Sequence, residues 1–144
     1  MKRVEPFEPW IFIFFGIFHL HRIWALIDRT SYADFWLGVF MRKDCFYYIL
    51  LGLLAILCVL GIRTFLNNLH NNFWWRWVYF LGGSYLLFDL FAIVTGLEFW
   101  EDILMKMFDV NAPYWNLIWG FFVLLGGMVF ILGIKLLMER HRQK

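Results

Sequence analysis

The amino-acid sequence predicts an all-α integral membrane protein, a four-helix bundle with two short interfacial amphipathic helices on the outer side. Composition is the first reason: 62% of the residues are hydrophobic and 23% are aromatic, whereas soluble domains are about 45–50% apolar. The second reason is a mean hydropathy of +0.66. The third is a set of apolar stretches long enough to cross a bilayer as helices, at about 10–27, 45–62, 73–96 and 114–137.

Length, charge and cysteine content narrow the remaining possibilities. The 144 residues allow one domain, so we predict a single transmembrane domain over residues 1–144. A net charge of +2 without a basic run argues against nucleic acid as a partner. Cys45 and Cys58 would lie about 20 Å apart on one helix, which is too far for a disulfide. The chain has no CxxC motif, which argues against thiol redox chemistry.

The first span is predicted over about 10–27. The charged residues 1–9 before it include Pro9, which suits the first turn of a helix because a missing N–H costs nothing there. A basic start followed by an apolar run is also typical of signal peptides. This run contains histidines and an arginine, and no small-residue cleavage site follows it, so we predict an uncleaved span.

Two elements follow the first span. Residues 28–44 are predicted to form an interfacial helix, because aromatic and apolar residues recur there at helical spacing opposite Asp34; an aromatic-rich loop is the alternative. Asp44 is a candidate N-cap for the second span, 45–62. The link over 63–72 is short and rich in Asn, so spans two and three are predicted to be antiparallel neighbours.

The second half repeats this order. The third span, 73–96, precedes a stretch in which acids alternate with aromatic and apolar side chains, a second candidate interfacial helix. Asn111 as a cap and Pro113 in the first turn predict the start of the fourth span, 114–137. An internal duplication is one interpretation of this order. Small four-span families such as the DoxX-like proteins have a similar outline, and no motif here assigns the chain to one of them.

The distribution of basic residues predicts that both termini are cytoplasmic. Cytoplasmic loops are richer in Lys and Arg than outer loops. Eight basic residues lie on the side of the termini and four on the other side. The first set is Lys2, Arg3, Arg63, Arg76, Lys135, Arg140, Arg142 and Lys144, and the second is Arg29, Arg42, Lys43 and Lys106.

A polar cluster lies inside the first span. An arginine at the centre of a span costs roughly 2.5–3.5 kcal/mol on insertion scales, so a partner is expected. Asp89 is the only acid inside another apolar span, and residue counting from the inner helix ends puts it at a depth similar to Arg22. We therefore predict an Arg22–Asp89 pair. The predicted polar centre comprises His19, His21, Arg22, Tyr85, Asp89 and Asn116.

Four interpretations of this centre stay open. It is a salt bridge that fixes helix register, a transport or proton-relay site, a site for an anionic or lipid-like ligand, or a metal or haem site. On a regular helix His21 points nearly opposite His19, which argues against joint metal binding. No catalytic residue, metal site or cofactor is predicted, because the chain has no HExxH, GxSxG or phosphate-loop motif.

Glycines predict helix-packing surfaces at Gly82 in the third span and at Gly120 and Gly127 in the fourth, because small residues let membrane helices approach closely. We expect a non-catalytic subunit or accessory component of a membrane complex. Its expected partners are the lipid bilayer and other membrane proteins or further copies of the chain. A small transporter or channel that uses the His/Arg/Asp centre is the alternative, and a membrane enzyme or cofactor-binding subunit is the third reading.

Overall fold

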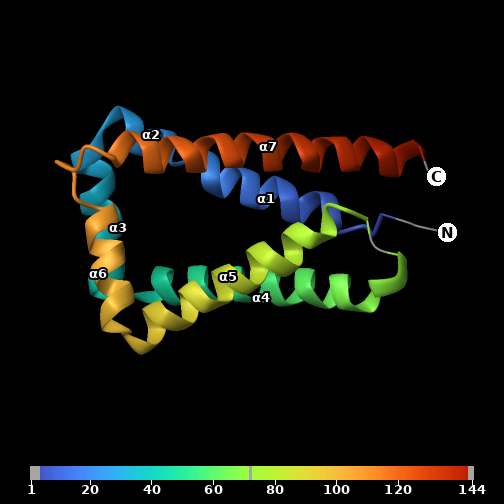
Figure 1. Ribbon diagram of the computed structural model, residues 1–144, viewed down its shortest axis with the longest axis horizontal. Helices are drawn as coiled ribbons and strands as arrows, with labels where there is room; N and C mark the ends of the chain where they lie inside the picture. The colour runs from blue at the N-terminus through green and yellow to red at the C-terminus, as the bar shows by residue number, and fades with distance from the viewer. Residues whose placement is uncertain (1–3, 72, 143–144) are drawn as a thin grey trace. The chain divides into compact units, whose positions relative to one another are not determined.

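The computed structural model describes residues 4–71 and 73–142, and in these ranges the regular structure is entirely helical. Figure 1 shows the elements in order: α1 (Glu8–Leu20), α2 (Ile23–Ile27), α3 (Arg29–Arg42), α4 (Cys45–Asn67), a 3₁₀ turn (Leu69–Asn71), α5 (Arg76–Thr95), α6 (Glu98–Met107) and α7 (Trp115–Arg142). Three basic residues of the topology prediction, Lys2, Arg3 and Lys144, lie outside the described residues, as does Asn72 of the predicted link.

Four segments are long and apolar enough to cross a membrane, which confirms that part of the prediction. They are Glu8–Ile27, which joins α1 and α2, Cys45–Asn67, Arg76–Thr95 and Trp115–Arg142. Contacts within the chain group it into two compact units. One unit covers Val39–Met105, and the described residues of the other are 4–38 and 106–142.

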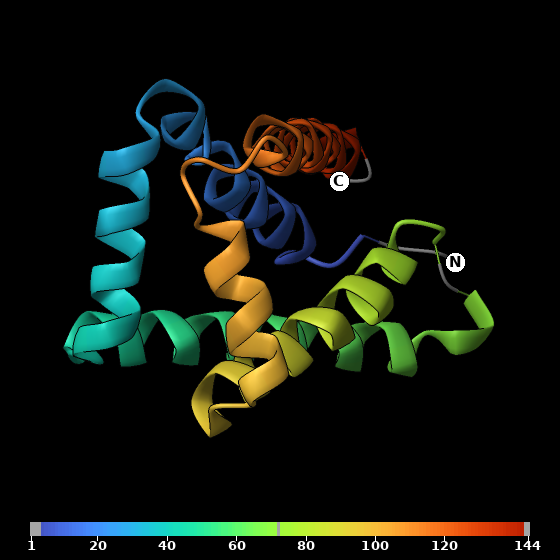
Figure 2. The same ribbon diagram turned by 60° about the vertical axis from the view of Figure 1, so that its left-hand side comes forward.

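In the first of these units, α4 and α5 pack against each other as predicted (Figure 2). Gly61 of α4 lies under the Tyr79 ring, where an added Cβ would come within 3.2 Å of the tyrosine Cβ. The start of α4 also follows the prediction. The Asp44 carboxylate caps it by accepting the backbone N–H of Tyr47 at 3.2 Å, which satisfies one of the unpaired donors of the first turn.

In the other unit, α1 and α7 run side by side and antiparallel (Figures 1 and 2). Glycines allow this approach, because a Cβ added to Gly16, Gly126 or Gly133 would come within 2.6, 2.7 or 2.8 Å of the facing helix. Real Cβ atoms do not approach other heavy atoms so closely, so these positions accept no larger residue without a shift of the helices. The close contacts pair Ile13 with Gly133, Gly16 with Phe130 and His19 with Gly126.

The first span is interrupted at His21 and Arg22, a feature that the sequence did not predict. Helix α1 ends at Leu20 and α2 begins at Ile23. The backbone N–H of Arg22 donates to the His19 carbonyl at 3.2 Å, a tighter turn than the α-helical one. The imidazole Nδ1 of His21 bonds the carbonyl oxygen of Phe18, and this side chain-to-backbone bond competes with regular helix.

The predicted packing glycines differ from those that make close contacts inside each unit. A Cβ at Gly120 or Gly127 would meet no described atom within 4 Å, and one at Gly82 would meet only Val78 of its own helix, at 4.0 Å. The close contacts lie at the adjacent residues, Gly83 and Gly126. Packing of the predicted glycines against another chain stays a prediction.

Candidate functional site

The Arg22 guanidinium, at the turn between α1 and α2, is surrounded by aromatic rings. Its central carbon lies 4.2 Å from the centre of the Phe122 ring and 5.7 Å from those of Phe18 and Trp119. Each ring face attracts a cation, by about 2 kcal/mol or more when the pair is desolvated. The rings of α1 and α7 therefore stabilise a positive charge where apolar surroundings would otherwise disfavour it.

Tyr32 of α3 completes the surroundings of Arg22. Its side chain is 2% exposed, and the Arg22 charge lies near enough to act on its hydroxyl group. Burial disfavours the charged phenolate and raises the pKa of Tyr32 to about 12, although the nearby Arg22 charge acts in the opposite direction. At neutral pH this site therefore contains a neutral phenol close to a guanidinium.

Both histidines contact the Phe18 ring, and each also contacts rings that the other does not. His19 stacks on Phe122, with ring centres 5.8 Å apart and planes 10° apart. His21 instead lies 5.3 Å from the Trp36 ring and 5.9 Å from the Tyr32 ring. Within the described residues, His19 Nδ1 and His21 Nε2 are buried atoms without a hydrogen-bond partner. In the same part of the chain, no group of three or more His, Cys, Asp or Glu residues is arranged to hold a metal ion.

The start of α7 and the loop before it are held by three long-range hydrogen bonds. The indole N–H of Trp115, a fully buried side chain, donates to the Ala25 carbonyl at 2.8 Å. The Arg29 guanidinium donates to the Val110 carbonyl at 3.2 Å and to the Asn116 side-chain oxygen at 3.0 Å. Asn116, one turn before Trp119 on α7, therefore bonds the first residue of α3.

Asp89 and Tyr85 gather around one indole in the unit of α4 and α5. The Trp100 N–H of α6 donates to the Asp89 carboxylate at 2.6 Å. The Tyr85 and Phe88 rings meet the Trp100 ring edge-on, at 6.3 and 5.2 Å between centres. This arrangement ties α6 to α5 between Tyr85 and Asp89, and its polar part is a charge-assisted hydrogen bond.

Two buried charged side chains were not part of the predicted centre. Glu8 is 0% exposed and its carboxylate accepts the backbone N–H of Glu5 at 2.7 Å. Arg76 is 1% exposed, and its guanidinium lies 5.1 Å from the centre of the Phe73 ring. Both stand at the first residue of a helix, where charged residues are ordinary, so the sequence carried no signal of their burial.

The predicted centre is thus divided between the two units. His19, His21, Arg22 and Asn116 belong to the unit of α1 and α7, whereas Tyr85 and Asp89 belong to the unit of α4 and α5. The Arg22–Asp89 pair stays a prediction. The aromatic residues around each polar group were missed, and their helical spacing, as in Tyr32 with Trp36 and Trp119 with Phe122, was the available signal. No family model, curated protein or solved structure matches the chain.

Proposed function

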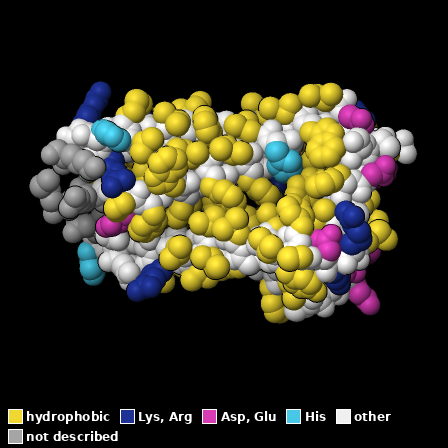
Figure 3. All heavy atoms as spheres, turned by 180° about the vertical axis from the view of Figure 1, so that it is seen from behind, with side chains coloured by type: hydrophobic (Ala, Val, Ile, Leu, Met, Phe, Trp, Pro, Cys, Tyr) yellow, Lys and Arg dark blue, Asp and Glu magenta, His cyan; other side chains and the backbone are white. Residues whose placement is uncertain are grey.

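We propose that this protein is a multi-pass membrane protein that acts as a non-catalytic accessory or interaction component of a membrane complex. The observation that supports this best is how little of each span is buried inside the chain. In the most apolar 18-residue stretch of each span, only 22% of the residues are buried in the first three spans and 17% in Trp115–Arg142. Figure 3 displays hydrophobic side chains over most of the face that it shows. Apolar surface of this extent needs lipid and partner helices to cover it.

The open face of α7 is the candidate contact surface for a partner helix. Leu117, Leu124 and Ile131 recur every seven residues on it and are 76%, 70% and 68% exposed. Gly120 and Gly127 lie between them, with open space where a Cβ would stand. A smooth glycine-containing face of this kind favours close packing of membrane helices, because backbones can approach there.

In this proposal both termini are cytoplasmic, and α3 and α6 lie at the outer interface. The eight-to-four distribution of basic residues supports the orientation. The composition of α6 supports its interfacial position. None of its residues is buried within the chain, and Phe99 and Ile103 alternate with its acids. An amphipathic helix without a buried face inside its own chain fits a boundary between lipid and water.

Substitutions on the open face of α7 test the proposal. Gly120→Val and Gly127→Val would block the seam without an intramolecular clash. Gly52→Val is the matched control, because Gly52 of α4 also has no described atom near its Cβ position. After purification in mild detergent, we expect a larger membrane protein to accompany the wild type and the control but not the seam variants. Repeated recovery of the wild type as a lone homo-oligomer would contradict the proposal, and a coloured or metal-loaded preparation would favour a cofactor-binding subunit.

A small transporter or channel is the second candidate, and the break in the first span favours it. Transporters bind substrates at interrupted helices, and His21 and Arg22 interrupt Glu8–Ile27. In this alternative the substrate site is the polar centre predicted from the sequence, which includes Asp89 and the predicted Arg22–Asp89 pair. The double reversal Arg22→Asp with Asp89→Arg distinguishes the two readings. Rescue of both folding and function would support a structural pair, whereas a folded but inactive protein would support a transport site.

A further inference from the structure

The C-terminal end of α7 combines basic side chains with an apolar hollow. The hollow is shallow and largely open, with a volume of about 440 Å³, and it is lined by Leu137, Met138, His141 and Arg142. Leu137 and Met138 are apolar, His141 is polar and Arg142 is cationic. The His141 ring is held in place by a hydrogen bond between its Nδ1 atom and the Leu137 carbonyl, at 3.1 Å.

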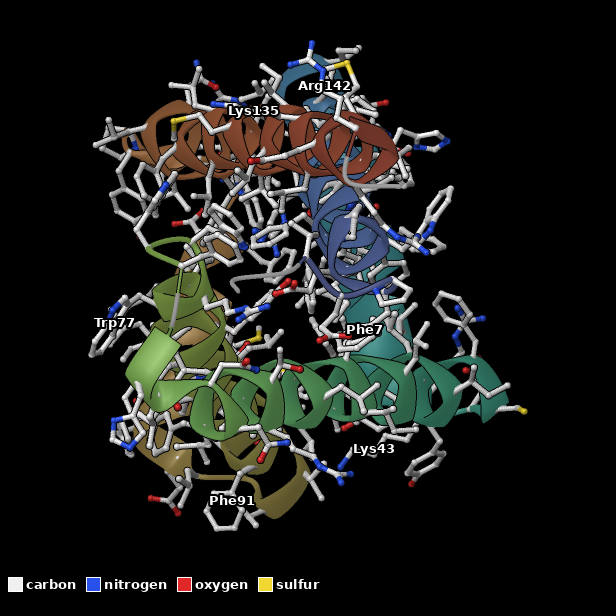
Figure 4. The ribbon with its side chains drawn as sticks, turned by 90° about the vertical axis from the view of Figure 1, so that its right-hand side faces the viewer. Phe7, Lys43, Trp77, Phe91, Lys135 and Arg142 are labelled. Carbon is white, nitrogen blue, oxygen red and sulfur yellow. The ribbon has the colours of Figure 1, made fainter. Side chains whose placement is uncertain are left out.

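Positive charge predominates around this hollow. Lys135 and Arg142 are seven residues apart, so they share a helix face, and Figure 4 shows both along the same edge of α7. Arg140 is engaged elsewhere, because it donates to the Pro6 carbonyl at 3.2 Å. Glu139 is the single acid in α7. The negative end of the helix dipole also favours cations at this position.

The length of α7 places these groups at the level of lipid headgroups. A helix of 28 residues is about 42 Å long at 1.5 Å per residue. The hydrocarbon core of a bilayer is about 30 Å thick. If Trp115 stands at one boundary of the core, the last eight or so residues extend beyond the other boundary. That segment begins near Lys135 and ends at Arg142.

We propose that this surface, formed by Lys135, Leu137, Met138, His141 and Arg142, binds an anionic phospholipid. The headgroup phosphate lies against Lys135 and Arg142, and the start of an acyl chain lies along Leu137 and Met138. A lipid fits better than a free anion, because the hollow is half apolar and continues the apolar surface of the spanning helix. The inference rests on the proposed membrane insertion of α7.

Native mass spectrometry of the purified full chain in detergent tests this site. Phosphatidylglycerol is titrated against phosphatidylcholine of the same acyl chains, with inorganic phosphate as a third arm. One basic side chain near an anionic lipid surface contributes about fivefold in affinity. We therefore expect Lys135→Gln with Arg142→Gln to weaken phosphatidylglycerol binding about 25-fold. Arg63→Gln is the matched control, since Arg63 is an exposed cation near the end of α4, and we expect it to leave binding unchanged.

Three results would overturn the proposal. Equal affinity for the two lipids would remove the anionic preference. An equal loss of binding in Arg63→Gln would reduce the effect to overall charge, and competition by inorganic phosphate at concentrations similar to the lipid would mean a free-anion site only. Flotation of the protein with phosphatidylcholine vesicles measures membrane insertion separately, so a failure of the proposed membrane location is distinguishable from a failure of this lipid site.

Discussion

Replacement of Gly126 by alanine tests the closest packing of α1 against α7. The added Cβ would lie 2.7 Å from the His19 Cβ and 2.9 Å from the backbone nitrogen of Leu20. The adjacent Gly127 is the matched control, because a Cβ there would meet no described atom within 4 Å. The two substitutions are chemically identical and one residue apart, so they differ only in the helix face that they change.

The expected magnitude follows from these distances. Overpacking costs about 1–3 kcal/mol, and the upper value applies to Gly126 because backbone atoms can move away only if α1 moves. Alanine is a better helix former than glycine by about 1 kcal/mol. We expect Gly126→Ala to destabilise by about 2 kcal/mol and Gly127→Ala to stabilise by up to about 1 kcal/mol. The unfolding equilibrium constants would then differ by about 100-fold.

Reversible unfolding in mixed micelles is the suitable assay. Sodium dodecyl sulfate is titrated into a mild detergent, and loss of structure is followed by circular dichroism and tryptophan fluorescence. Both variants are compared with the wild type at the same micelle composition. Equal stability of Gly126→Ala and Gly127→Ala would refute the assignment of Gly126 to the helix contact.

Three further predictions concern single side chains. Trp100→Phe removes the donor to the Asp89 carboxylate and should lower the free energy of unfolding by about 1–3 kcal/mol; retention of wild-type stability would mean that this hydrogen bond does not hold α6. Trp115→Phe should cost a similar amount, about 1–3 kcal/mol, by leaving the buried Ala25 carbonyl unpaired, and a denaturant titration measures it. Because the folded pKa of Tyr32 is about 12 rather than its ordinary 10.0, stability from the neutral phenol is complete below pH 10 and falls toward pH 12. The stability advantage of the wild type over Tyr32→Phe should therefore shrink across this range, and a constant difference would show that the tyrosine does not titrate with unfolding.

Local and compositional features could be predicted from the sequence. The apolar runs predicted four helices of spanning length, which the fold confirms, because the length of such a run is a property of the chain alone. The cap at Asp44 and the pairing of α4 with α5 also followed from near neighbours. A short link between two consecutive helices constrains them to pack side by side.

The faces of the helices and their partners were decided only by the tertiary structure. Gly126 and Gly127 are equivalent in sequence terms, yet they point about 100° apart, and only the position of α1 determines which one is in contact. The same holds for Gly82 and Gly83. The rings around Arg22 include Phe122, a hundred residues away in sequence. Helical periodicity defines a face, but the partner of that face depends on the packing of helices far apart in the chain, which periodicity does not contain.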